Sequence, residues 1–140
     1  MDLNNNFIKK TLYVSVIDDD PIIRTMLIRI LKVMNLNHFE LDIDTFENGL
    51  QFFESKRLEG NGEHFLILDG VMPVMDGIEI LQKVKRIENG RNIHVLMLTG
   101  RKRETDMERA LKLGADDYMT KPFSIKELQA RIERLIKRMN

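Results

Sequence analysis

Short runs of apolar residues alternate along this chain with longer stretches in which apolar positions repeat at helical spacing. The runs are rich in β-branched and aromatic residues and end abruptly at polar ones, a pattern typical of buried strands. The longer stretches place apolar residues three or four positions apart, which predicts amphipathic helices. The predicted strands cover residues 12–17, 38–46, 65–68, 93–98 and 117–120, and the predicted helices cover residues 21–34, 47–57, 78–87, 104–113 and 124–139.

Several residues at the predicted helix ends support these boundaries. Pro21 suits the first turn of a helix, because proline lacks the N–H that this turn leaves unpaired. Asn89 and Gly90 are expected to close the third helix. Ser124 is expected to cap the last helix, with Glu127 three residues later completing a capping box.

Strands that alternate with helices predict an α/β fold, in which helices cover both faces of a parallel sheet. The length of 140 residues is close to the commonest size of one domain. We therefore expect a single domain over residues 1–140, with its core at about residues 11–138. In such sheets, ligands bind at the carboxyl ends of the strands.

Polar residues stand at those strand ends. Ionised carboxylates crowded at one sheet edge repel one another unless they share a cation. Mg²⁺ is the expected ion, because it binds a few carboxylates and fills its octahedron with water, carbonyl and phosphate oxygens. In the other interpretation the aspartates only form loops or cap helices. The strand-end residues are Asp18, Asp19 and Asp20 after the first strand, Asp69 after the third, Thr99 at the fourth and Lys121 after the fifth.

Composition narrows the class of protein. Lys and Arg number 22, as do Asp and Glu, so bulk attraction to nucleic acid or an anionic membrane is not expected. The absence of cysteine excludes disulfides and thiolate metal sites. No apolar run approaches the ~20 residues of a membrane-spanning helix, and the start does not read as a signal peptide. We expect a soluble, cytoplasmic protein with no membrane attachment and no direct nucleic-acid binding.

Asp69 lies within LILDGVMPVMDG, which resembles the phosphorylation loop of the response-regulator receiver family. The segments VIDDDP, LMLTG and GADDYMTKPF extend the resemblance in the family's order and spacing over residues 12–138. The resemblance implies a flavodoxin-like (βα)5 three-layer sandwich, with a five-stranded parallel sheet in the order 2-1-3-4-5. It also implies a two-component phosphoacceptor rather than an enzyme, one that catalyses only its own phosphorylation and slow dephosphorylation.

The resemblance also implies a metal and phosphoryl site. Asp69 would be the nucleophile that takes the phosphoryl group. Asp19 would bind Mg²⁺ directly and Asp18 through water, Mn²⁺ being an alternative ion. Asp69 and the backbone carbonyl of Val71 would be further protein ligands.

Three residues would complete the chemistry and the switch. The Thr99 hydroxyl and the Lys121 ammonium group would each contact a phosphoryl oxygen, which suits phosphoryl transfer. The bond between Lys121 and Pro122 is usually cis in this family. Tyr118 matches the aromatic residue that turns inward when Thr99 moves toward the phosphoryl group.

The implied partners are other signalling proteins. A sensor histidine kinase or a phosphotransfer protein would supply the phosphoryl group, and an output domain or a downstream protein would respond. A homodimer would use the face made by the fourth helix, the fifth strand and the fifth helix, which correspond to residues 104–113, 117–120 and 124–139. Asp117 and Arg131 match positions that form a cross-dimer ion pair in DNA-binding receivers.

Two other readings use the same residues. Asp18 followed by Asp20 also fits the D-x-D motif of haloacid-dehalogenase-like phosphatases, with Asp18 as the nucleophile, but this reading leaves Asp69 and its loop unexplained. A pseudo-receiver would bind partners without phosphorylation, yet every position of the receiver site is intact.

Overall fold

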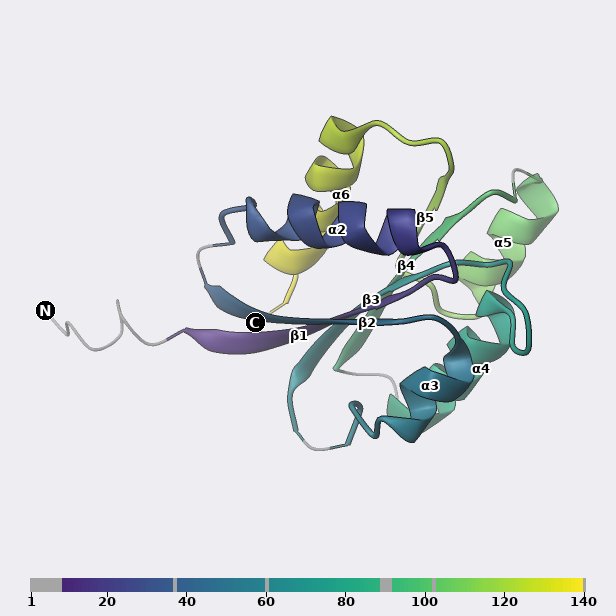
Figure 1. Ribbon diagram of the computed structural model, residues 1–140, viewed down its shortest axis with the longest axis horizontal. Coiled ribbons are helices and arrows are strands. Elements are labelled where there is room, and N and C mark those ends of the chain that lie inside the picture. The colour runs from purple at the N-terminus through teal and green to yellow at the C-terminus, as the bar shows by residue number, and fades with distance from the viewer. Residues whose placement is uncertain (1–8, 37, 60, 89–91, 102, 140) are drawn as a thin grey trace, which may run out of the picture.

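The computed structural model describes residues 9–36, 38–59, 61–88, 92–101 and 103–139 (Figure 1). Over these residues strands and helices alternate, as the hydrophobic pattern predicts. The strands are β1 (Lys10–Ile17), β2 (Phe39–Phe46), β3 (Glu63–Leu68), β4 (Ile93–Thr99) and β5 (Asp117–Thr120). The helices are α2 (Pro21–Lys32), α3 (Gly49–Glu54), α4 (Gly77–Glu88), α5 (Glu104–Lys112) and α6 (Ile125–Lys137).

The strands form one parallel sheet in the order β2-β1-β3-β4-β5, which confirms the expected topology. Helices α2 and α6 cover one face, and α3, α4 and α5 cover the other (Figure 1). Each face has its own apolar core, one centred on Leu12, Val14 and Leu96, the other on Leu66, Ile80 and Val95. The result is the three-layer sandwich that alternating strands and helices require.

The register brings the carboxyl ends of the central strands level. Ile17 of β1 pairs with Leu68 of β3, and Leu68 pairs with Met97 of β4. Asp18 directly follows Ile17, and Asp69 directly follows Leu68. Two acidic side chains therefore leave the sheet side by side at one edge.

The helix ends follow most of the sequence signals. Pro21 is the first residue of α2, as predicted, and the Ser124 side chain accepts a hydrogen bond from the Glu127 N–H over 3.3 Å. The Glu127 carboxylate, expected to complete the capping box, bonds to Arg131 over 3.0 Å. Gly114, with a φ of 110°, follows the end of α5. Asn89 and Gly90 lie outside the described residues.

Helix α3 is shorter than the predicted range of 47–57, since it covers only residues 49–54. Asn48 caps its start by accepting a hydrogen bond from the Gln51 N–H over 2.9 Å. Beyond its end, Lys56 has a φ of 57°, a left-handed conformation that a helix does not allow. Arg57 then points toward β1, where its Nε donates to the Ser15 hydroxyl over 2.9 Å. The inward arginine explains why the helix ends early.

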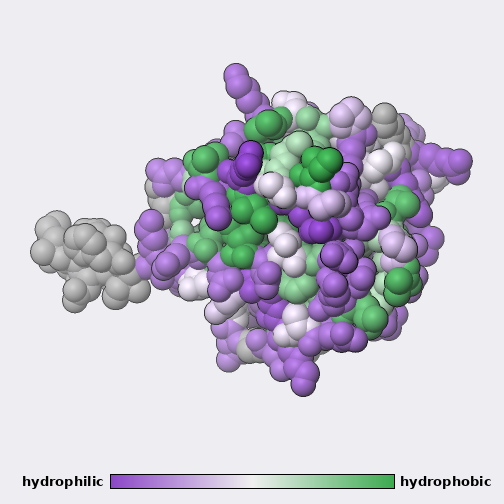
Figure 2. Space-filling model, viewed as in Figure 1, coloured by the Kyte–Doolittle hydropathy of each residue, from purple (hydrophilic) through white to green (hydrophobic). Residues whose placement is uncertain are grey.

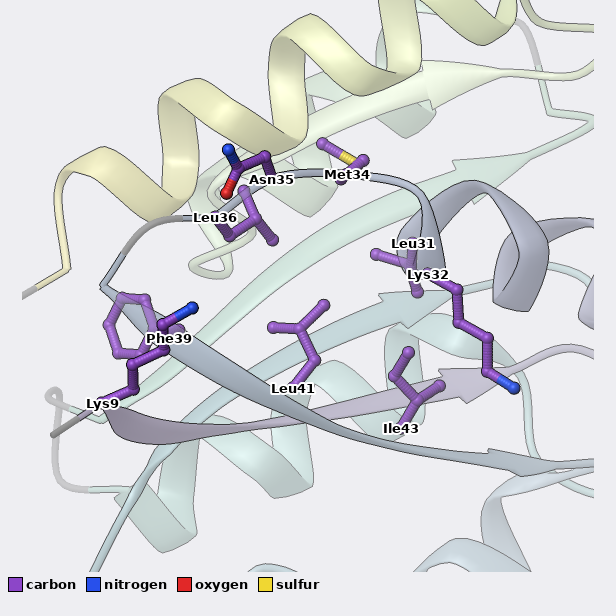
Figure 3. Close-up of a pocket in the computed structure, with 9 residues that line it drawn as sticks. All are labelled: Lys9, Leu31, Lys32, Met34, Asn35, Leu36, Phe39, Leu41 and Ile43. Carbon is purple, nitrogen blue, oxygen red and sulfur yellow. The ribbon is translucent and has the colours of Figure 1, made fainter. Parts of the chain in front are cut away.

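A groove of about 360 Å³ opens between the end of α2 and β2, the edge strand of the sheet (Figure 3). Leu41 and Ile43 of β2 line one side, Leu36 lies across from them on the segment after α2, and Lys9 and Lys32 lie at the ends of the groove. Figure 2 shows these hydrophobic side chains as a green area between α2 and β2. In the part of the chain that the structure describes, no helix is both long and apolar enough to cross a bilayer.

Candidate functional site

The carboxyl ends of β1 and β3 bring three of the predicted site residues together. One carboxylate oxygen from each of Asp18, Asp19 and Asp69 lies within 4.8 Å of the others. Asp18 and Asp69 are buried, whereas Asp19 is exposed. This arrangement offers several oxygen ligands to one small cation.

Hydrogen bonds from the loop and from α2 fix Asp18. The Asp20 backbone N–H donates to Asp18 Oδ1 over 2.9 Å, and Arg24 Nη1 donates to the Asp18 carbonyl over 2.7 Å. The Asp20 carboxylate accepts from the Ile22 N–H over 2.9 Å, so Asp20 is the helix cap that one interpretation allowed. The sequence analysis did not identify Arg24. The available signal was an arginine in the first turn of a helix that follows an acidic loop.

Lys121 reaches the acidic cluster from the loop after β5. Its Nζ lies 2.7 Å from Asp18 Oδ2 and 3.5 Å from Asp69 Oδ2. Burial alone would lower the pKa of Lys121, but the hydrogen bond to Asp18 and the two carboxylate charges raise it. The ammonium group is therefore charged at neutral pH. The bond between Lys121 and Pro122 is cis, as the resemblance implies.

The surroundings of Asp69 disfavour its ionised form. Burial raises the pKa of its carboxyl group, and the charges of Asp18 and Asp19 add to this effect. A hydrogen bond from the Val71 N–H to Asp69 Oδ1, 3.1 Å long, and the charge of Lys121 act in the opposite direction without cancelling it. The Lys121 ammonium group contacts two of the three clustered carboxylates, those of Asp18 and Asp69, so negative charge is in excess within the cluster.

The donor set fits a hard divalent cation such as Mg²⁺. All the clustered side-chain donors are carboxylate oxygens, which Mg²⁺ prefers, and the excess negative charge would be neutralised by such an ion. Asp18, Asp19 and Asp69 would hold it, with the Val71 carbonyl as the further ligand that the resemblance implies. The Val71 side chain is about half exposed, at 49%.

The loop after Asp69 is packed too tightly for side chains at two glycines. A Cβ at Gly77 would overlap the Asp69 carbonyl oxygen, and a Cβ at Gly70 would lie 2.8 Å from Thr99 Oγ1. The Gly77 N–H donates to the Gly70 carbonyl over 3.1 Å and closes the loop. Thr99, which is fully buried, therefore lies beside the residue that follows Asp69.

Tyr118 lies apart from the carboxylates and points inward. It is buried, and its hydroxyl donates to the Arg101 carbonyl over 2.9 Å. The Arg101 N–H in turn donates to Thr99 Oγ1 over 3.3 Å. Arg101 therefore connects Tyr118 to Thr99, a connection that the sequence did not reveal.

Asp117 and Arg131, predicted as a cross-dimer ion pair, already pair within one chain. Arg131 Nη1 lies 2.8 Å from Asp117 Oδ1, and Arg134 Nη2 lies 3.4 Å from Asp117 Oδ2. The pair joins the start of β5 to α6.

The chain resembles known proteins along most of its length. A family model described as the response regulator receiver domain matches residues 14–133. The phosphate regulon transcriptional regulatory protein PhoB of Escherichia coli (strain K12) is 36% identical over 126 residues. The alkaline phosphatase synthesis transcriptional regulatory protein PhoP of Bacillus subtilis (strain 168) is 35% identical over 123 residues. These matches cover 89% and 88% of this chain but 52% and 48% of the relatives, so the chain spans about half their length.

Solved structures agree with this resemblance. The receiver domain of the Francisella response regulator 1452 is 31% identical, with a TM-score of 0.71 over 91% of this chain and 98% of that one. The BeF3-activated DrrB receiver domain is 26% identical, with a TM-score of 0.75 over 93% of this chain and 99% of that one.

Proposed function

This chain belongs to the response regulator receiver domain family, and we propose that it accepts a phosphoryl group on Asp69 in a two-component phosphorelay. The observation that carries the proposal is the cluster of Asp18, Asp19 and Asp69 beside Lys121 at the carboxyl end of the sheet. We further propose that residues 11–138 act as one receiver unit in the cytoplasm. Family membership argues against the phosphatase, which would use Asp18 as its nucleophile and would leave Asp69 and its loop without a role.

Asp69 would act as the nucleophile. One of its oxygens would attack the phosphorus of a phosphohistidine, while the bond to the imidazole nitrogen breaks and its electrons return to that nitrogen. A divalent cation, Mg²⁺ or Mn²⁺, would supply charge neutralisation and in-line orientation. Asp18 and Asp19 would hold this cation together with Asp69 and the Val71 carbonyl.

Lys121 and Thr99 would stabilise the phosphoryl oxygens. Lys121 Nζ is only 3.5 Å from Asp69 Oδ2, so a short movement away from Asp18 would bring it to a phosphoryl group. Thr99 is beside Gly70 and would donate its hydroxyl. Hydrolysis would be slow, because Val71 has no group that could orient a water and Arg101 could cover the approach.

The switch would pass from Thr99 to Tyr118 and on to the face made by α5, β5 and α6. Arg101 supports this route, since it contacts the Thr99 and Tyr118 hydroxyls through its backbone. That face would then bind an output domain, a downstream protein or a second copy. In a homodimer, an Asp117–Arg131 pair across the interface would replace the one formed within the chain. The names of the relatives suggest control of transcription as the output.

Incubation with acetyl phosphate and Mg²⁺ tests the proposal. Intact-mass spectrometry should show one phosphoryl group per chain, which is lost in Asp69→Asn while the circular dichroism spectrum stays unchanged. His38→Gln, at an exposed residue far from the cluster in sequence, serves as the matched control and should label normally. Continuous release of phosphate that depends on Asp18 would point to a phosphatase, and no reaction would point to a pseudo-receiver.

A further inference from the structure

A second surface feature lies outside the candidate site, in a groove of about 380 Å³ between α3 and α4. Figure 2 shows it as green side chains at the lower right, over the two helices labelled α3 and α4 in Figure 1. Four apolar and two cationic residues line it, namely Leu50, Phe53, Met75, Ile87, Lys83 and Arg86.

Apolar side chains of this groove are exposed to water, which is unfavourable in free energy. Leu50 is 49% exposed and Ile87 is 56% exposed, whereas the neighbouring Phe52, Ile80 and Val84 fill the core. Hydrophobic side chains that gather in an open hollow are typical of interaction sites. An apolar hollow between two helices suits a third, amphipathic helix.

The charges around the groove define the partner. Lys83 and Arg86 both project from α4, and within the described residues neither forms an ion pair or a side-chain hydrogen bond. Cations left unpaired beside an apolar hollow attract carboxylates and repel other cations. A partner that fits must therefore carry Asp or Glu next to its apolar side chains.

The groove adjoins the loop of the candidate site. Met75, which forms part of its wall, belongs to the loop between Asp69 and α4. Val74, the residue before it, is 78% exposed and has a φ of 73°, which is unfavourable for a β-branched residue. The groove in Figure 3 has cations too, but it lies at the β2 edge and shares no residue with this loop.

We propose that the groove between α3 and α4 is a docking site for an acidic amphipathic helix of a partner protein. Leu50, Phe53 and Ile87 would receive the apolar side chains of that helix, and Lys83 and Arg86 would pair with its carboxylates. The surface is separate from the α5–β5–α6 face and from the metal cluster. Docking requires no phosphoryl chemistry, so this proposal can be tested independently of the role of Asp69.

Peptide selection on the intact chain tests the proposal. Phage-displayed peptides would be selected against the wild-type protein, and the selected sequences would be synthesised and titrated by fluorescence anisotropy. We expect amphipathic peptides rich in Asp and Glu. Their dissociation constants should rise roughly ten-fold or more in Leu50→Ser with Ile87→Ser, and also in Lys83→Glu with Arg86→Glu.

The control is a matched pair in the other groove, Lys32→Glu with Ile43→Ser, which should leave binding unchanged. The charge-reversed variant changes only α4 surface residues, so it remains informative if the apolar variant fails to fold. Selected peptides without carboxylates, or peptides insensitive to both groove variants, would overturn the proposal. Binding to phosphatidylserine vesicles by the wild type, but not by Lys83→Glu with Arg86→Glu, would also overturn it, since the surface would then fit a membrane.

Discussion

At the carboxyl end of the sheet, the carboxylates of Asp18, Asp19 and Asp69 lie together, and the ammonium group of Lys121 contacts those of Asp18 and Asp69. The amino end gathers a different cluster, in which two carboxylates surround an imidazole. His94 Nε2 lies 3.6 Å from Glu63 Oε2, and His94 Nδ1 lies 3.8 Å from Asp116 Oδ1.

The amino-end cluster balances its own charges. The hydrogen bond to Asp116 raises the pKa of His94 against the effect of burial, and the Glu63 charge adds to it. Burial would raise the pKa of Asp116, but His94, the Val95 N–H and Lys85 together lower it. The Val95 N–H donates to Asp116 Oδ2 over 2.7 Å.

The difference separates a stabilising cluster from a binding one. Carboxylates that meet protein cations and N–H groups contribute to folding, whereas carboxylates in excess destabilise the fold until a ligand neutralises them. At the amino end, Asp116 is paired within the protein, whereas the buried Glu63 Oε2 accepts no hydrogen bond from the described residues. The carboxyl end holds a cluster of carboxylates whose charge a divalent cation would neutralise.

Metal binding should show the largest contrast between the two ends. Asp19→Asn removes one of three clustered carboxylates while nearly keeping its shape, so Mg²⁺ affinity should fall roughly ten-fold or more. Glu63→Gln makes the same change at the amino end and should leave the affinity unchanged. Isothermal titration calorimetry of both variants checks this, and equal affinities would place the metal elsewhere.

Stability without Mg²⁺ should change in opposite directions at the two ends. Asp116→Asn weakens the contacts to His94, Lys85 and the Val95 N–H, and should lower the free energy of unfolding by about 1–2 kcal/mol. Asp19→Asn relieves repulsion and should leave this free energy unchanged or raise it. Urea denaturation in the presence of a chelator measures both. A stability loss in Asp19→Asn as large as that in Asp116→Asn would remove the distinction.

The smallest expected effect is a pH dependence of the free energy of unfolding that comes from His94 at the amino end. The pKa of His94 is raised above its usual 6.5, so its contribution is fully present below about pH 6.5 and is lost as pH rises through the folded value. The free-energy advantage of the wild type over His94→Gln should therefore shrink from pH 6 to pH 8. Urea midpoints across that range test it, with His38→Gln as the exposed control. A constant difference would contradict a contribution of the His94 charge to stability over this range.

The contrast between the two ends also explains what the sequence could predict. The strands were predictable because apolar runs stop at polar residues, and the carboxyl-end site because its residues follow those stops in recognisable motifs. The order of the strands came from the family resemblance and agrees with the structure.

The amino-end cluster could not be predicted in the same way. Glu63, His94 and Asp116 are far apart in the chain. Asp116 lies in the GADDYMTKPF segment, but no motif links it to the other two, and Glu63 and His94 meet through the pairing of β3 with β4. The early end of α3 was hidden for a similar reason, since it depends on the long-range bond from Arg57 to Ser15. Contacts between distant residues carry no local pattern.

Mapping the phosphoryl group tests the central claim most directly. The wild-type protein would be incubated with acetyl phosphate and Mg²⁺, reduced with borohydride to trap any acyl phosphate, digested, and sequenced by mass spectrometry. We predict reduction at Asp69 alone, and none when a chelator replaces Mg²⁺. Reduction at Asp18 or Asp19, or labelling of Asp69 that persists without a divalent cation, would contradict the account.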